Sequence, residues 1–576
     1  MLYRRIILLI LLFPIIVSSQ INYNLKIESL DTVSKNIVKK LRYLTDYNDS
    51  LTIIKTLNNI TENIRNEGYL LASFDSIRID SNIFKAYLKS GKKFNKGLIN
   101  LDKIPVQALI FAGLKNKKVG IDICEFLKKR ELLITYYENN GFPFASIKLD
   151  SIYQYENGIN AIGSLNKSNQ FIISSFIITG YDQLNKNYLL SQIGINLETS
   201  YDESKIKSIP EAINELPFVE IVGKPLIFFK ENNTVQIICE LRKKSSNQFD
   251  GLIGFAPDPL NNYKLLITGK VSINSNNVLN YGELIDLDWQ KIDANSQKLF
   301  AGYSLKYIFK SRIGSESNIT ILKQDTSYLN TELYTAIPYY FSYNKLIKIY
   351  FENKSSTLIN QSIIKDEITL PEYADIRKTT IGAGAKLWQL DYFYNPKRGY
   401  IFELMAGSGS KNIDKNPFAN QEIYSNIALK TTHLELKNSF SIFIPLSNKT
   451  VLMLEDKSAI MQSSTLFKNE LYKIGGAKTL RGFDENSIPC SRYSIGTIEY
   501  RFIFQKSSNI FAFFNAAYYE NRISKTIHDI PYGFGIGLNL KNKSNVFSIS
   551  YAYGSQFGNP IAFYAAKIHF GYVTVF

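Results

Sequence analysis

The chain has 576 residues, more than one compact hydrophobic core usually contains, so several domains are expected. Its formal charge of +16 is spread along the sequence without a zinc-finger, helix-turn-helix or RNA-binding signature, which argues against a nucleic-acid partner. Aromatic residues make up 13% of the chain, with 38 Tyr and 37 Phe. This composition is typical of long strands and of the aromatic girdles of membrane barrels.

Residues 1–19 are predicted to be a secretory signal peptide. Arg4 and Arg5 precede the apolar run from Ile6 to Val17, and two serines follow it. Beyond this segment no run of about 18 apolar residues exists, so the sequence contains no candidate membrane-spanning helix. An exported, aromatic-rich chain of this kind favours a transmembrane β-barrel, in which each strand has only a weak signal.

The cysteines and histidines do not predict a metal site. Cys124, Cys239 and Cys490 lie far apart and are odd in number, so they define no disulfide framework, and the three histidines are equally dispersed. No cofactor is therefore predicted. No nucleophile elbow, HExxH or acid-pair motif occurs either, so we expect no enzymatic activity.

The segment from Gln20 to about Lys244 repeats one supersecondary unit about three times, with a period of roughly 75 residues. Amphipathic helices are predicted over 51–66 and 124–140, and each is followed by a Gly, an aromatic residue and strand-like runs. A more diverged third copy places its helix over 202–216. The pattern predicts three consecutive α+β domains.

From about Asn247 the helical period disappears, and alternating strand-like runs follow one another between Asn, Ser and Gly turns. At roughly 20 residues for a tilted strand and its turn, this region provides about 16 antiparallel strands. One turn has the pattern Asn-Pro-x-x-Gly, in which Pro396 fixes the corner and Gly399 permits the re-entry. An antiparallel transmembrane β-barrel is therefore predicted after the α+β domains.

The most distinctive segment is Lys473 to Asn486, KIGGAKTLRGFDEN. Its paired glycines permit a sharp backbone path, and its arginine is a planar cation that needs a carboxylate partner when it is removed from water. In the following strand-like run, Tyr493 to Phe504, alternation places Glu499 on the polar face, within reach of that arginine. The candidate site residues of the loop are Gly475, Gly476, Leu480, Arg481, Gly482 and Phe483.

This segment resembles the LRGF loop of the Omp85 family of outer-membrane proteins, the surface antigen D15 group that includes BamA, TamA and the two-partner-secretion transporters. In that family the loop after the eleventh strand enters the barrel lumen, and its Arg pairs with acidic groups on the wall. The N-terminal repeats resemble the POTRA domain, a β-α-α-β-β periplasmic module. The resemblance implies a signal peptide at 1–19, POTRA-like domains at 20–95, 96–172 and 173–246, and an Omp85-type barrel at 247–576.

Two further segments carry the resemblance and also depart from it. The strand Phe511 to Tyr519 has Asn515 where the family usually has the loop arginine's second acidic partner, so Glu499 is expected to carry more of the pairing. The run from Tyr564 to the end resembles the terminal β-signal of outer-membrane proteins, although an aromatic residue is usual at position 574. Its candidate residues are His569, which we expect to face the lumen, Gly571, Thr574 and Phe576.

The resemblance implies a bacterial outer-membrane protein with its N-terminal domains in the periplasm. We expect an assembly factor, because Gly251, Gly254 and Pro257 make the first strand, near Phe249 to Phe255, a poor partner for the last one. Its expected partners are outer-membrane lipid and lipopolysaccharide, unfolded outer-membrane protein clients, and periplasmic or lipoprotein accessory subunits.

A two-partner-secretion exporter is the alternative function. Such exporters usually carry two repeats and an N-terminal plug helix, whereas this chain has three repeats and no plug segment after Ser19. An inert pore or adhesin would leave the repeats without a use.

Overall fold

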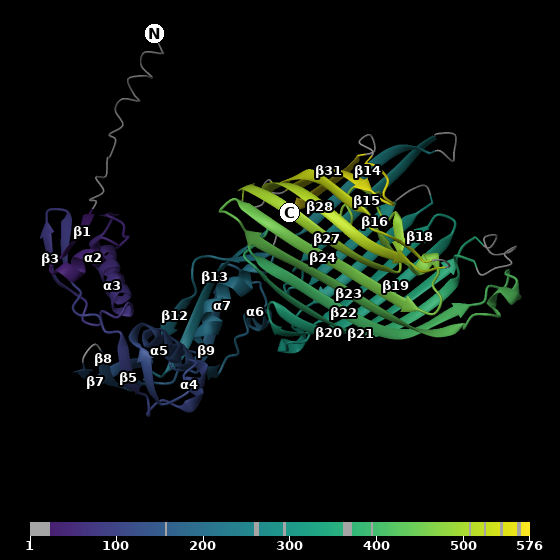
Figure 1. Ribbon diagram of the computed structural model, residues 1–576. Coiled ribbons are helices and arrows are strands. Elements are labelled where there is room, and N and C mark those ends of the chain that lie inside the picture. Colours follow the sequence, from purple (N-terminus) through teal and green to yellow (C-terminus); the bar gives the residue numbers. More distant parts are fainter. Residues whose placement is uncertain are drawn as a thin grey trace, which may run out of the picture. The chain divides into compact units, whose positions relative to one another are not determined.

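The computed structural model describes residues 23–575 apart from gaps at 156–157, 259–263, 292–294, 361–370, 393–394, 506–507, 524–525, 542–544 and 562–565. The predicted signal peptide and Phe576 lie outside the described residues. Three α/β domains precede a large antiparallel barrel (Figure 1). Among the described helices, none has both the length and the hydrophobicity to cross a bilayer.

The first domain is a four-stranded sheet in the order β2-β1-β4-β3, with β1 and β4 parallel. Helix α3 begins after Asp49, whose carboxylate accepts a hydrogen bond of 2.7 Å from the backbone N–H of Thr52. One apolar stripe of this helix is buried in the domain core: Ile53, Leu57, Ile60 and Ile64. The elements are β1 (Tyr23–Ser29), α2 (Thr32–Val38), β2 (Asp46–Tyr47), α3 (Ser50–Asn66), β3 (Ser73–Asp80) and β4 (Ile83–Lys89).

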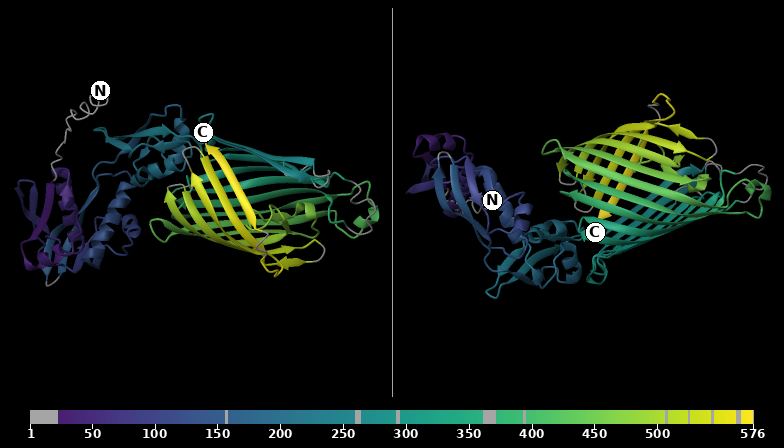
Figure 2. Two further views of the ribbon diagram at one scale, coloured as in Figure 1. Left: turned by 90° about the horizontal axis from the view of Figure 1, so that it is seen from above. Right: turned by 60° about the horizontal axis from the view of Figure 1, so that its bottom comes forward.

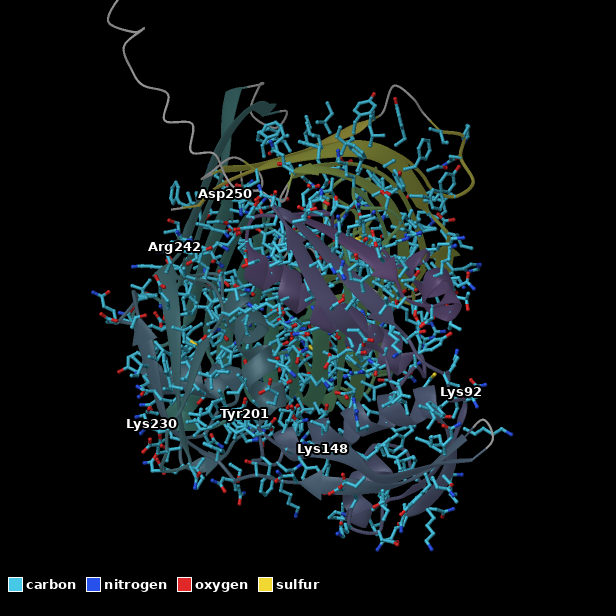
Figure 3. The ribbon with its side chains drawn as sticks, turned by 90° about the vertical axis from the view of Figure 1, so that its left-hand side faces the viewer. Lys92, Lys148, Tyr201, Lys230, Arg242 and Asp250 are labelled. Carbon is cyan, nitrogen blue, oxygen red and sulfur yellow. The ribbon has the colours of Figure 1, made fainter. Side chains whose placement is uncertain are left out.

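The second and third domains repeat this order of elements. The second has the sheet order β6-β5-β8-β7, and the third has β10-β9-β13-β11 with β12 also paired to β13. In the third domain, the aromatic side chain of Tyr201 is buried. Arg242, which is labelled in Figure 3, pairs with Glu220 at 2.6 Å. The elements of the second domain are β5 (Lys96–Asn100), α4 (Val106–Phe111), β6 (Lys118–Asp122), α5 (Ile123–Glu138), β7 (Ser146–Tyr155) and β8 (Gly158–Asn166). Those of the third are β9 (Ile172–Thr179), α6 (Lys186–Ile193), β10 (Thr199–Ser200), α7 (Glu203–Asn214), β11 (Val219–Ile221), β12 (Leu226–Phe229) and β13 (Thr234–Lys243).

Each domain has a second helix that the sequence pattern did not single out. The predicted helices correspond to α3, α5 and α7, whereas α2, α4 and α6 have seven, six and eight residues. Two turns are too short to display a clear helical period.

The barrel consists of seventeen strand segments in the described residues, and its first and last strands, β14 and β32, are paired. Segments β29 and β30 both pair with β28, β29 opposite Tyr519–Asn521 and β30 opposite Asn509–Ala516, so they occupy one position and sixteen positions form the wall. Figure 2 shows the common tilt of these strands.

The bounds of the strand segments are β14 (Gln248–Asp258), β15 (Lys264–Asn276), β16 (Leu284–Lys291), β17 (Gln297–Leu305), β18 (Ser315–Gln324), β19 (Tyr328–Ser342), β20 (Lys345–Leu358), β21 (Asp375–Leu390), β22 (Gly399–Asp414), β23 (Lys430–Pro445), β24 (Thr450–Ser463), β27 (Arg492–Gln505), β28 (Ser508–Asn521), β29 (Ile527–Asp529), β30 (Tyr532–Lys541), β31 (Asn545–Ser555) and β32 (Lys567–Val575).

Alternation along the strands separates an apolar outer face from a polar interior. On β27, Ile498, Tyr500 and Phe502 are exposed, while Thr497 and Glu499, which alternate with them, are buried. An exposed apolar band on the outside and charged groups inside are what a barrel surrounded by lipid requires.

Candidate functional site: the lumen loop and the barrel seam

The loop between β24 and β27 folds back into the barrel as a hairpin, which we call the lumen loop (residues 464–491). Within it β25 (Tyr472–Ile474) pairs with β26 (Ile488–Cys490). Gly475 and Gly476 adopt φ angles of +111° and +103°, which residues with a side chain rarely adopt. Leu480 is fully buried and shares an apolar cluster with Ile495 of β27 and Ala517 of β28. The loop therefore packs on the inner face of the wall.

The structure brings Arg481 together with both of its predicted partners. Its Nη1 lies 2.6 Å from Oε2 of Glu499, and its Nε donates to Oδ1 of Asn515 at 3.0 Å. The guanidinium also lies 3.5 Å from the ring centroid of Phe513, within the range of a cation–π contact. The side chains of Arg481 and Glu499 are only 12% and 5% exposed, so the pair is largely removed from water.

Glu499 does not serve Arg481 alone. Its second oxygen, Oε1, lies 2.8 Å from Nε of Arg501, which the sequence pattern had placed only on the same face of the strand. Asn515 is likewise shared, because its Nδ2 donates to Oγ1 of Thr497 at 2.5 Å. One carboxylate thus balances two arginines, and Asn515 contributes a hydrogen bond but no charge.

The backbone of the Arg-Gly-Phe motif contacts the strands β30 and β31 directly. Gly482 has φ of +95°, and a Cβ there would overlap the carbonyl oxygen of Tyr553. A Cβ at Gly533 would overlap the carbonyl oxygen of Arg481, and one at Gly554 would lie 2.6 Å from the carbonyl oxygen of Gly482. Three glycines therefore permit the close approach, and the two on the wall were not predicted as site residues.

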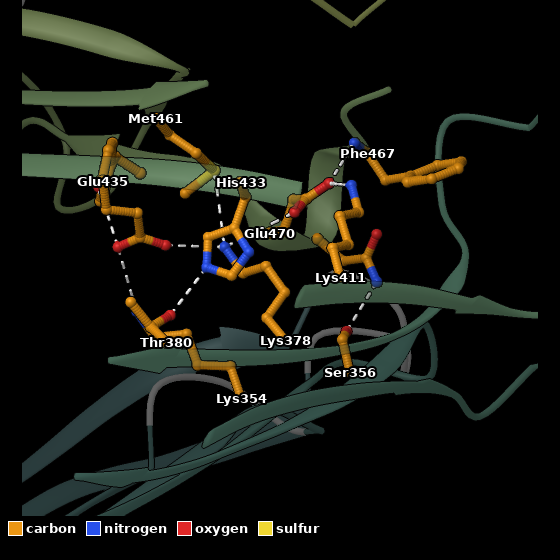
Figure 4. A network of polar contacts seen from close by, with 12 residues as sticks. Lys354, Ser356, Lys378, Thr380, Lys411, His433, Glu435, Met461, Phe467 and Glu470 are labelled. Atoms are coloured by element: carbon orange, nitrogen blue, oxygen red, sulfur yellow. Dashed lines mark hydrogen bonds and ion pairs between the residues drawn. The ribbon is translucent and has the colours of Figure 1, made fainter. Parts of the chain in front are cut away.

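The base of the lumen loop is held by a buried network of charges (Figure 4). Glu470 contacts Nζ of Lys411 with one oxygen and lies 3.6 Å from Nζ of Lys378 with the other. Lys378 is in turn 2.9 Å from Glu435, whose second oxygen is 3.8 Å from Lys354. Because an unpaired buried charge is costly, each member of this alternating chain depends on its neighbours.

A second set of hydrogen bonds fastens the same end of the loop. Nδ2 of Asn469 donates to the hydroxyl of Ser356 at 2.7 Å and to the carbonyl of Ala374 at 2.8 Å. Phe467 donates its backbone N–H to Glu470 at 3.0 Å. The loop is thus attached at its base to β20–β23 and at its tip to β27–β31. The attachment at the base was not among the predicted site residues, although the Lys and Glu residues on these strands are a sequence signal for charges that face the lumen.

The seam between the first and last strands has a short ladder. In the described residues β14 and β32 pair only at Gln248 with Val575 and at Phe249 with Thr574. By contrast, β14 pairs with β15 from Gln248 to Asp258, and β31 pairs with β32 from Asn545 to Ala552. Most of β14, including Gly251, Gly254 and Pro257, is therefore not paired with the described residues of β32.

The predicted terminal signal lies mostly on β32. Ile568 and Phe570 are 66% and 52% exposed on the outer face, whereas His569 between them is half-buried. Gly571 is opposite Ser548 of β31, and Thr574 is one of the two seam residues on this strand. Phe576 lies outside the described residues.

An antiparallel barrel of sixteen strand positions, preceded by three α/β domains and carrying a loop in its interior, is an architecture of outer-membrane proteins. The sequence matches the Omp85 superfamily domain over residues 228–575, more than half of the chain. The chain therefore belongs to the Omp85 superfamily and is a bacterial outer-membrane β-barrel protein. No curated protein matches the sequence significantly.

Solved structures with similar folds share little sequence with this chain. CdiB from Escherichia coli is 10% identical, with a TM-score of 0.53, and the match covers 91% of this chain and 98% of that one. CdiB from Acinetobacter baumannii is 12% identical, with a TM-score of 0.51 and coverages of 85% and 91%. BamA from Haemophilus ducreyi lacking POTRA domains 1–3 is 14% identical, with a TM-score of 0.43 and coverages of 84% and 100%.

Proposed function

We propose that this protein is an outer-membrane assembly factor that inserts β-barrel proteins by strand pairing at the seam. The observation that carries the proposal is the short register of β14 with β32, two residue pairs in the described residues. An unpaired backbone group in hydrocarbon costs several kcal/mol. A client strand that adds to the β14 edge satisfies those groups, so insertion proceeds without exposing unpaired backbone to lipid.

The α/β domains are proposed to lie in the periplasm and to receive unfolded outer-membrane protein clients there. The sheet edges β2 and β3 in the first domain, and β6 and β7 in the second, offer backbone hydrogen bonds to an extended peptide. Such pairing demands little of the client sequence. Lipid, lipopolysaccharide and periplasmic or lipoprotein accessory subunits complete the proposed set of partners, and the activity is not enzymatic.

Export of an extended polypeptide through the lumen is the alternative within the same family. It requires the lumen loop to leave its place, and both the Glu470 network and the Arg481 contacts would have to break first. Removing one partner of a buried charge pair costs about 3 to 5 kcal/mol, because the other charge is left buried and uncompensated. This cost favours the seam over the lumen as the route of the client.

A disulfide across the seam tests the proposal. Phe249→Cys and Thr574→Cys replace residues that face each other in the register, and directly opposed residues in antiparallel strands have Cα atoms about 4.5 to 5.5 Å apart, within disulfide range. Ile549→Cys with Phe570→Cys is the matched control, because it joins the ordinary neighbours β31 and β32. The three native cysteines, none of which is in a disulfide, are replaced by Ser in both variants.

Insertion of client barrels is then measured in proteoliposomes with each disulfide oxidised and reduced. An assembly factor is expected to lose insertion only when the seam disulfide is oxidised and to regain it on reduction. Undiminished insertion through the oxidised seam would rule out the proposed route.

A further inference from the structure

A cavity of about 560 Å³ lies where the last strand of the third α/β domain leads into β14. We call it the junction pocket. Its walls come from the end of β13 and the linker after it, from the turn between β15 and β16, and from Tyr181, Gln183 and Phe218 of the third domain. All of these residues belong to one compact unit of the chain. The lining residues that matter here are Tyr181, Lys243, Lys244, Ser246, Asn277 and Val278.

The lining is cationic and rich in hydrogen-bond donors. Lys243 and Lys244 both contribute to it, with serine hydroxyls and asparagine amides beside them, and none of the lining residues is acidic. The nearby carboxylate of Glu283 is 1% exposed and accepts hydrogen bonds from the backbone N–H groups of Leu279 and Tyr281. That negative charge is therefore engaged by its own turn.

Hydrogen bonds between lining residues form the walls, and one of them runs from the backbone N–H of Lys244 to the carbonyl of Phe218 at 2.9 Å. Nδ2 of Asn277 donates to the hydroxyl of Tyr181 at 2.9 Å, and that hydroxyl donates to Oδ1 of Asn280 at 3.2 Å. The backbone N–H of Asn276 donates to Oδ1 of Asn247 at 2.9 Å. The pocket is thus preformed by contacts among its own lining residues. Nζ of Lys243 lies 5.8 Å from the ring centroid of Tyr181, a cation–π contact that does not neutralise the lysine charge.

Exposed apolar side chains lie next to this polar pocket in the chain. Val278, Leu279 and Tyr281 of the β15–β16 turn are 56%, 63% and 56% exposed. Phe249, just after the linker, is 47% exposed and is a seam residue of β14. A cationic pocket with an apolar border of this kind matches an amphiphile that has an anionic head and an apolar tail.

We propose that the junction pocket binds the phosphate of an anionic phospholipid from the leaflet on the side of the α/β domains. Lys243 and Lys244 pair with the phosphate, and the acyl chains lie along Phe249 and the exposed turn. The bound lipid would occupy the start of β14, at the two residue pairs that close the seam. Lipid binding stands independently of whether the protein assembles or exports its client.

The test uses the full-length protein in detergent, titrated with phosphatidylglycerol, with bound lipid counted by native mass spectrometry. Wild type is expected to retain one lipid ahead of non-specific adducts. Lys243→Gln with Lys244→Gln is expected to weaken this binding roughly thirtyfold, the combined effect of two lysines beside an anionic group. Lys224→Gln with Lys230→Gln, which removes two exposed lysines of the same domain outside the pocket, is the control and is expected to match wild type.

A second variant guards against misfolding of the first. Val278→Asp adds a carboxylate to the lining at an exposed turn position and leaves the lysines in place, and it is expected to weaken binding by a similar factor. Different migration of unboiled and boiled samples in cold detergent gels establishes that each variant retains its barrel. Unchanged lipid binding in folded pocket variants would overturn the proposal.

Inorganic phosphate forms the other arm of the experiment. Retention of the lipid in the presence of equimolar inorganic phosphate supports a lipid site. Displacement of the lipid by phosphate would assign the pocket to the free anion and overturn the lipid assignment.

Discussion

Truncation of the loop arginine measures how firmly the lumen loop is held. Arg481→Ala removes the salt bridge of 2.6 Å to Glu499, the hydrogen bond of 3.0 Å to Asn515 and the contact with the Phe513 ring. Hydrogen bonds to charged groups contribute about 1.5 to 3 kcal/mol each, and a desolvated cation–π contact about 2 kcal/mol. Because Glu499 keeps Arg501 at 2.8 Å, we expect a loss of about 3 kcal/mol in the free energy of loop opening, less than the sum.

Glu499→Ala is expected to cost at least as much. It leaves Arg481 and Arg501 without the carboxylate that both contact, so two cations remain in one partly buried place. In the double variant only Arg501 remains, and part of the penalty disappears. The double-mutant cycle should therefore give a coupling free energy of about 1.5 to 3 kcal/mol.

Hydrogen–deuterium exchange of the loop peptide in micelles reports the free energy of opening. Its backbone N–H groups include Gly476, which donates to the carbonyl of Leu480 at 3.1 Å. Arg522→Ala is the control, because Arg522 is 43% exposed and its pair with Glu520 at 2.8 Å should contribute less than about 1 kcal/mol. Strictly additive effects of Arg481→Ala and Glu499→Ala would refute the inference that this pair holds the loop.

Gly533→Ala should speed hydrogen–deuterium exchange of the loop by the equivalent of about 1 to 3 kcal/mol, because the new methyl group would overlap the carbonyl oxygen of Arg481. Gly496→Ala is the control and should be neutral, because the added methyl group would meet no atom closer than 3.9 Å. Equal behaviour of the two variants would exclude the backbone contact as an anchor. Asn515→Asp adds a carboxylate beside Arg481 and should slow exchange by the equivalent of about 1 to 2 kcal/mol; unchanged or faster exchange would contradict this. Burial raises the pKa of Glu215 above its ordinary value of 4.5, although a hydrogen bond from Trp388 opposes the shift. The folded chain then binds this proton more tightly than the unfolded chain, so stability should fall as pH rises from about 4.5 through the folded pKa. Thermal unfolding between about pH 4 and pH 8 should show this slope in wild type and not in Glu215→Gln, and equal slopes would contradict it.

The sequence by itself determined the local features of the chain, such as the face of a strand on which a residue lies. Alternation over Tyr493 to Phe504 placed Glu499 on the inner face, and the glycines around Arg481 marked a loop with an unusual backbone path. The predicted helices of the three repeats and about sixteen strands followed from periodicity and length alone. These features depend on local geometry, which a period of two or 3.6 residues records.

Only the tertiary structure decided what meets across the barrel. The pairing of Arg481 with Glu499, the contacts of Gly533 and Gly554 with the loop, and the Glu470 network all join the loop to strands of the wall. The short ladder of the seam depends on the register between the two ends of the barrel, 327 positions apart at Gln248 and Val575. Side-chain alternation assigns each residue of a strand to one face of the sheet. It does not specify which residue of a distant strand lies opposite, because closure of the whole sheet sets that register.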